Sequence, residues 1–324
     1  MPKNDPIQSA LDRLGELRHD EPTAAVTEEL RGFLRNRSNL VVAKVATVVR
    51  ELRIIALIPE LVTAFNKFVA DAPRLDKRCA AVTEIISALY ELDYDEPDPY
   101  LAGIKHVQLE GSYGPPIDEG AKLRAVSAQG LLRTRHLDAP SEVVQLLVDR
   151  EPAARIGAVR ALATNGGEAG VLLLRLKTLT GDTEPAVLAE CFAGLLAASP
   201  KKSAAFVGKY VDADDEATAE AAMLALGESR LSAAYKLLKE KWDRTVLMPQ
   251  RKVLLVAMAV SKLDEAIAFL VSLVESANVS IAAVAIEALS IYRHNERVSK
   301  SVRDAVTRRK ERTLVDRFEK NFRS

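Results

Sequence analysis

Apolar side chains recur at helical spacing along nearly the whole chain, and no segment shows the alternation of apolar and polar residues typical of a strand. Seven segments end in small residues followed by a leucine or a valine. They are IISAL (85–89), SAQGL (127–131), AVRAL (158–162), CFAGL (191–195), MLAL (223–226), VAMAV (256–260) and AIEAL (285–289). Their last residues lie 29 to 42 residues apart, which is the period of stacked helix pairs. The pattern therefore predicts an all-α fold.

The apolar stripes and turn residues divide the chain into helices. We expect a first helix over Ile7–Arg18, eight helix pairs between Thr23 and Tyr292, and one final helix over Val298–Asn321. Because an array needs polar covers at its ends, we expect three parts. They are an N-terminal capping helix (1–22), a repeat array (23–292) and a basic C-terminal capping helix (293–324).

Small residues precede the last residue of each recurring segment. We expect a bulky side chain there to push neighbouring repeats apart, because close helix packing tolerates added volume poorly. The seven small residues are Ala88, Gly130, Ala161, Gly194, Ala225, Ala259 and Ala288.

Acidic residues and prolines gather where second helices begin, as in Asp149–Pro152 and Asp182–Pro185, and we expect them to cap these helices. The segment that follows the first of these turns, Glu151-Pro-Ala-Ala-Arg-Ile-Gly-Ala-Val-Arg-Ala-Leu162, resembles HEAT repeats, in particular the bacterial HEAT-like repeats of the bilin-lyase type. The resemblance implies a right-handed α-α solenoid of about eight helix pairs with helical N- and C-terminal caps. It also implies that the second helices line the concave face and that Pro59 bends a first helix.

Composition places few limits on function. Apolar residues make up 48% of the chain and aromatic residues 5%, so small aliphatic side chains fill the core. The longest uncharged apolar run, VLLVAMAV (253–260), is too short to cross a bilayer, and the first residues lack the apolar core of a signal peptide. We therefore expect a cytoplasmic protein that does not bind membranes.

Few residues point to chemistry. The four histidines and two cysteines form no metal-binding motif, and no phosphate-binding loop or nucleophile elbow is present, so we expect no catalytic residue, metal or cofactor. Two enzymatic alternatives remain open because both use HEAT-like scaffolds. One is a lyase-like enzyme or subunit, and the other resembles the alkylpurine DNA glycosylases. Near-neutral charge and scarce aromatic residues argue against nucleic-acid binding.

Two features are candidates for binding a protein partner. The first is a set of basic residues on or beside early second helices, and the second is a long turn over residues 109–120 with an aromatic side chain beside two prolines. For the basic residues, the alternative is a ladder that ties neighbouring turns together, and the long turn is equally compatible with a plain elongated loop. The candidate residues are Arg50, Arg78, Lys122, Arg124, Arg155, Arg160, Tyr113, Pro115 and Pro116.

Charge is unevenly distributed although the formal net charge is zero. Residues 293–324 carry 11 Lys/Arg and 5 Asp/Glu, so the rest of the chain has a net charge of −6. A basic end can attract an anionic partner or can simply be a solvated helix. We therefore expect a non-catalytic scaffold or adaptor that binds a protein partner through the solenoid surface. The sequence does not indicate its oligomeric state.

Overall fold

The computed structural model describes residues 5–111 and 114–322. Within these ranges the chain forms twenty α-helices, four 3-10 helices and two strands of two residues each. Its packing divides the chain into two compact units, unit 1 (Met1–Leu173) and unit 2 (Leu174–Ser324). The boundary falls inside one helix, α11 (Gly167–Thr180).

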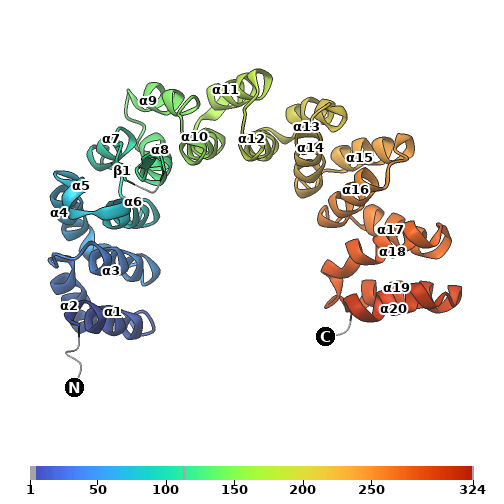
Figure 1. The fold of residues 1–324 in the computed structure, drawn as a ribbon, viewed down its shortest axis with the longest axis horizontal. Helices are drawn as coiled ribbons and strands as arrows, with labels where there is room; N and C mark the ends of the chain where they lie inside the picture. The colour runs from blue at the N-terminus through green and yellow to red at the C-terminus, as the bar shows by residue number, and fades with distance from the viewer. Residues whose placement is uncertain (1–4, 112–113, 323–324) are drawn as a thin grey trace. The chain divides into compact units, whose positions relative to one another are not determined.

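Unit 1 consists of two layers of helices (Figure 1). In the layer of second helices, α1 packs on α3, α3 on α6, α6 on α8, and α8 on α10. The 3-10 helices Ile55–Leu57 and Lys77–Cys79 lie before α4 and α6. The second-helix layer contains α1 (Pro6–Leu17), α3 (Asn39–Glu51), α6 (Ala80–Glu91), α8 (Ala121–Thr134) and α10 (Pro152–Asn165). The first-helix layer contains α2 (Ala24–Leu34), α4 (Ile58–Val69), α7 (Asp98–Ile104) and α9 (Ala139–Leu146), and the short α5 (Ala72–Leu75) follows α4.

Unit 2 repeats the same arrangement. Consecutive second helices pack on one another from α12 to α20, and each lies against a first helix. The 3-10 helices Lys209–Asp212 and Ser290–Tyr292 follow α13 and α18. The second helices are α12 (Pro185–Ala198), α14 (Glu216–Glu228), α16 (Met248–Val260), α18 (Val279–Leu289) and α20 (Arg312–Phe322), and the complete first helices are α13 (Pro200–Gly208), α15 (Ser232–Arg244), α17 (Asp264–Ser276) and α19 (Glu296–Arg309).

The prediction of an all-α, HEAT-like array of helix pairs is confirmed by this element order and packing. The expected acidic caps form only in part. The Asp215 carboxylate caps α14 by accepting the N–H of Thr218 at 2.9 Å. Before α10 and α12 the carboxylates of Asp149 and Asp182 accept the N–H groups of Glu151 and Glu184, each at 2.8 Å, which order the turn but belong to residues that precede the helix, so no side chain caps these two helices.

Three expected features differ from the structure. The segment 109–120 contains a short hairpin, β1 (Leu109–Glu110) with β2 (Ile117–Asp118), where only a turn was expected. The final helix is two helices, α19 and α20, because Lys310 adopts a left-handed conformation with φ of 58° and ends α19. Pro59 bends no helix, since it lies in the first turn of α4, where a proline removes no helical hydrogen bond.

All seven small residues of the recurring segments are buried, but their position is not always the contact between repeats. A Cβ atom on Gly130 would lie 2.2 Å from the ring of Tyr100, which belongs to the first helix of the same pair. A close contact between two repeats occurs instead at Gly157 of α10. A Cβ on Gly157 would lie 2.3 Å from the Cα of Ala125 in α8, and α8 and α10 therefore approach with their backbones nearly touching.

Replacing Gly157 with alanine should destabilise unit 1 by about 1–3 kcal/mol, because α8 and α10 must move apart. Gly15 offers a matched control, since it is also helical and a Cβ there meets nothing within 4 Å. Gly15→Ala should raise the free energy of unfolding by up to about 1 kcal/mol through helix propensity. Denaturant unfolding of both variants measures the difference. An equal change in the free energy of unfolding in the two variants would contradict the close approach of α8 and α10.

Candidate functional site

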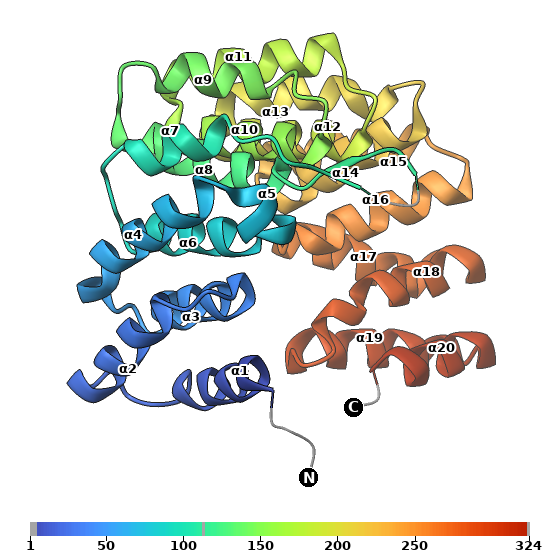
Figure 2. The same cartoon turned by 60° about the vertical axis from the view of Figure 1, so that its left-hand side comes forward.

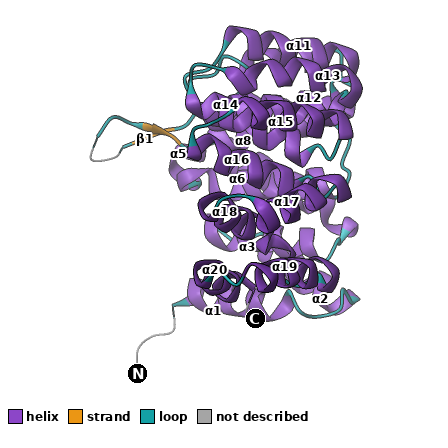
Figure 3. Cartoon of the chain, turned by 90° about the vertical axis from the view of Figure 1, so that its right-hand side faces the viewer, coloured by secondary structure: helices purple, strands orange, loops and turns teal. Residues whose placement is uncertain are grey.

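The hairpin is the main irregular element of unit 1 and stands out from the helices (Figure 3). Leu109 pairs with Asp118 and Glu110 pairs with Ile117 in antiparallel register. Directly paired residues point to the same face, so Glu110 and Ile117 share one face and Leu109 and Asp118 share the other. An isolated hairpin of this size is not stable in water, and its surroundings must therefore hold it in place.

Asp76 anchors the turn on which the hairpin rests. Its side chain is fully buried, and its two oxygens accept the N–H groups of Ala81 and Val82, both at 2.9 Å, at the start of α6. Asn39 of the preceding repeat donates its side-chain amide to the same carboxylate at 3.0 Å. One carboxylate therefore caps a helix and joins two repeats.

Gln108 and Glu110 attach the first strand to this turn. The buried Gln108 amide donates to the Asp76 carbonyl at 2.9 Å and to the Glu110 carboxylate at 2.7 Å. The backbone N–H of Arg78 also donates to Glu110, at 2.7 Å. Burial alone would raise the pKa of Glu110. The hydrogen bonds that its carboxylate accepts from Arg78 and Gln108 outweigh burial and hold the pKa below its usual value. The carboxylate is thus charged and held in place.

Arg124 attaches the second strand to α8 and to the next repeat. Its guanidinium lies 2.8 Å from the Asp118 carboxylate and donates through Nε and Nη2 to both oxygens of Asp149, each at 3.0 Å. It also donates to the His106 carbonyl at 2.8 Å. Only 3% of Arg124 is exposed, so this cation is removed from water and almost fully paired.

The pKa of Asp118 reflects the same contacts. Burial would raise it, but the N–H groups of Gln108 and Gly120 and the Arg124 guanidinium hold the pKa below its ordinary value. The carboxylate therefore stays ionised in the folded protein well into the acidic range.

Asp76, Gln108, Glu110 and Asp118, together with Arg124, form a frame that holds the hairpin. A hollow of about 540 Å³, the hairpin hollow, lies between this frame and the second helices of unit 1. Two cations, Arg78 and Lys122, are exposed on its wall, and Ile117 beside them is 53% exposed. Glu84 and Glu119 also contribute to the lining. The hollow thus presents an apolar side chain next to positive charge, on elements fixed by buried hydrogen bonds.

The cysteine in the hollow is not a reactive thiol. Cys79 is fully buried, and burial, reinforced by the nearby carboxylates of Asp76 and Glu110, raises its pKa to about 12. Burial likewise raises the pKa of Cys191 in unit 2 to about 12. Both thiols therefore remain protonated near neutral pH.

The structure separates the basic residues predicted from the sequence. Arg124 and Arg155 are buried, and the Arg155 guanidinium donates to the carbonyls of Asp149 and Arg150. Arg124 thus reaches Asp149 in the turn of the next repeat, as the ladder alternative expected, whereas these contacts of Arg155 lie in the turn before its own helix. Arg50 is partly buried and lies 3.5 Å from the Glu84 carboxylate.

The remaining candidates are at the surface. Arg78, Lys122, Arg160, Pro115 and Pro116 are exposed, and the structure brings only Arg78 and Lys122 into the hollow. Tyr113 lies outside the described residues.

Sequence reasoning missed the residues that build the frame, namely Asp76, Gln108, Glu110 and Asp118. Asp76 carried a usable signal, because it precedes a second helix just as Asp149 and Asp182 do. Gln108 carried none, since its role depends on contacts with residues 32 positions away.

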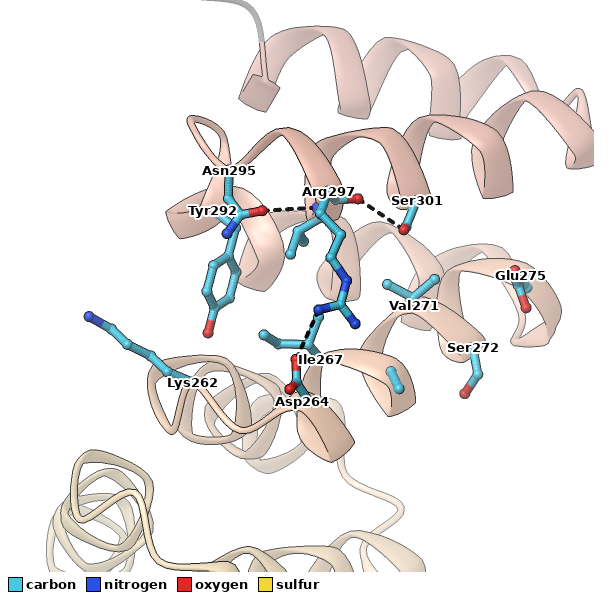
Figure 4. Close-up of a pocket in the computed structure, with 12 residues that line it drawn as sticks. Lys262, Asp264, Ile267, Val271, Ser272, Glu275, Tyr292, Asn295, Arg297 and Ser301 are labelled. Atoms are coloured by element: carbon cyan, nitrogen blue, oxygen red, sulfur yellow. Dashed lines mark hydrogen bonds and ion pairs between the residues drawn. The ribbon is translucent and has the colours of Figure 1, made fainter.

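A second hollow, of about 520 Å³, lies between α17 and α19 of unit 2. Figure 4 shows Arg297 above Asp264, and the Nη1 and Oδ1 atoms of this pair lie 3.6 Å apart; Ile267 and Val271 line the same hollow. No group of three or more His, Cys, Asp or Glu residues suited to a metal ion occurs in the described part of the chain. None of the described helices is long and apolar enough to span a bilayer.

Comparisons with known proteins give limited information. No family model matches the chain, and no curated protein matches it. Among solved structures it is similar to the complex of CpcE and CpcF of phycocyanin lyase from Nostoc sp. PCC7120, with 14% identity over 78% of this chain and 94% of that chain and a TM-score of 0.36. It is also similar to an engineered protein, with 18% identity over 100% and 97% of the two chains and a TM-score of 0.34. What this chain does must therefore be inferred from its own residues.

Replacing Arg124 with methionine should lower the free energy of unfolding by about 3–5 kcal/mol, because two partly buried carboxylates lose their cation. Lys122→Met is the matched control two positions away, where the exposed side chain should contribute less than about 0.5 kcal/mol. Denaturant unfolding compares the two variants. A change of less than about 1 kcal/mol in the Arg124 variant would show that the triad carries little stability.

Asp118→Asn should make unfolding less dependent on pH. A carboxylate with a lowered folded pKa stabilises the protein fully above its unfolded pKa of about 3.9 and loses this contribution as the pH falls through the folded pKa. The stability difference between the wild type and the variant should therefore be constant from pH 7 to 5 and shrink below about pH 4. Urea unfolding at several pH values measures it. A difference that grows towards low pH would contradict the assigned direction.

Proposed function

We propose that this protein is a non-catalytic adaptor that binds a protein partner through the hairpin hollow of unit 1. The observation that carries the proposal is an exposed apolar residue, Ile117, beside two exposed cations, Arg78 and Lys122, on an ordered frame. Binding costs less when the surface is already ordered, because fewer side chains and loops lose freedom on association.

The lining also indicates the kind of partner. Ile117 offers apolar area that a partner side chain can cover, and the cations favour a carboxylate nearby. A protein segment with an apolar anchor next to an acidic residue fits both. Glu84 and Glu119 in the same lining disfavour a purely polyanionic partner.

The alternative of an enzyme or enzyme subunit on the same scaffold remains a prediction. The phycocyanin lyase named above has too little structural likeness to this chain to carry its activity over. The protonated state of Cys79 argues against a thiolate nucleophile in the hollow. The cytoplasmic location expected from the sequence also remains a prediction.

Capture from an extract of the cells that make the protein, with the intact chain immobilised, tests the proposal. We expect one stoichiometric protein to be recovered, and its affinity should fall about tenfold with Ile117→Ser, because covering an isoleucine stabilises a complex by more than 1.4 kcal/mol. Leu137→Ser is the control, since Leu137 is 94% exposed and lies after α8, outside the hollow. Lys122→Gln should also weaken capture, and Arg135→Gln should not.

Equal recovery by the Ile117 and Leu137 variants would move the binding site away from the hollow. Recovery of nucleic acid in place of a protein would overturn the proposed class of partner.

A further inference from the structure

The last helix pair of unit 2, α19 and α20, lies in a basic segment of a chain whose formal net charge is zero. The two helices lie side by side near the C-terminus (Figure 2). Residues 293–324 have 11 Lys/Arg against 5 Asp/Glu. The described cations of this segment fall into two groups, according to whether a carboxylate lies within ion-pair distance.

The first group is paired with acidic residues. Arg308 pairs with Glu275, Arg317 with Glu287, Arg309 with Glu311, and Arg297 with Asp264. Three of these pairs link the last helix pair to α17 or α18. The role of these three cations is therefore to hold neighbouring repeats together.

Part of the second group faces a hollow of about 600 Å³ on α19, whereas Lys310, Arg312 and Lys320 are not among its lining residues. Phe322 of α20, which is 9% exposed, also lines it. Arg293, Lys300 and Arg303 line it, and among the described residues no ion pair to a carboxylate involves them. His294 is a further lining residue. Their charges are therefore not neutralised by an ion pair among the described residues, and Arg293 instead donates to the His294 ring at 3.0 Å.

Aromatic side chains position one of these cations. The Arg303 guanidinium lies over the Phe318 ring at 5.8 Å, and Phe318 stacks on Phe322 with ring centroids 4.8 Å apart and planes 18° apart. The hollow thus contains a cation that is oriented by an aromatic ring.

A polar cover for the last repeat does not by itself require this arrangement. The N-terminal helix α1 also ends a stack, and its two arginines are both paired, Arg13 with Glu16 and Glu29, and Arg18 with Glu51. Balanced charges suffice for solvation there. In the α19 hollow three cations outnumber the two lining carboxylates, Glu296 and Asp304, so an acidic ligand would balance the remaining positive charge.

We propose that the hollow lined by Arg293, Lys300 and Arg303 binds an acidic polypeptide segment. Two carboxylates, Glu296 and Asp304, lie among the cations, which suits a ligand with spaced charges better than a continuous phosphate backbone. The carboxylates of such a segment match the lining cations in charge. This surface lies in unit 2 and is independent of the function proposed for unit 1.

Fluorescence anisotropy with labelled poly-L-glutamate tests the proposal on the full-length chain at low salt. We expect binding that weakens about tenfold in the double variant Lys300→Gln, Arg303→Gln, because two exposed charge contacts are lost. The matched control is Lys201→Gln, Lys202→Gln, which removes the same charge from exposed positions on α13. Affinity should return in Lys300→Arg, Arg303→Lys, which keeps both charges.

Thermal unfolding of each variant shows whether a loss of binding reflects a loss of structure. An equal decrease in the control, or no binding of poly-L-glutamate to the wild type, would overturn the proposal. An oligothymidylate that binds the same residues more tightly than poly-L-glutamate would overturn it in favour of a nucleic-acid ligand.

Discussion

The candidate site of unit 1 depends on one buried ionic contact, the triad of Arg124 with Asp118 and Asp149. Removing an arginine from water is costly, and the cost is offset only when nearly every donor finds an acceptor. Here Asp149 accepts two hydrogen bonds, and Asp118 and the His106 carbonyl lie within 2.8 Å of the same guanidinium. One side chain thereby joins a strand, a helix and the turn of the next repeat.

The triad explains why a hairpin of two-residue strands is ordered. Asp118 receives backbone N–H groups on one side and the guanidinium on the other, while Glu110 and Gln108 tie the first strand to the Asp76 turn. The hydrogen bonds lie at the base of the hairpin. Ile117, Arg78 and Lys122 are consequently presented from a fixed base, which is what a binding surface needs in order to lose little entropy.

The sequence was sufficient for the helix pairs, because apolar spacing and acidic turns are local signals. The sequence also contained a signal for the burial of Arg124, one of the candidate partner-binding residues. Arg124 is three and seven residues before the buried Ser127 and Leu131, so it falls on the buried face of α8, whereas Lys122 does not. The hairpin was not predictable in this way, since two-residue strands are too short to show alternation. The break at Lys310 was also hidden, because apolar residues continue at helical spacing on both sides of it.

Hydrogen exchange of the free protein tests the central claim that the hairpin base is ordered before any partner binds. The backbone N–H groups of Arg78, Gln108 and Gly120 donate to buried or partly buried carboxylates, so they should exchange at least about 100-fold more slowly than in an unstructured peptide. In the Arg124→Met variant the protection of Gln108 and Gly120 should fall sharply, while amides in α3 stay protected. Exchange of all three amides at the unstructured rate in the wild type would contradict the account.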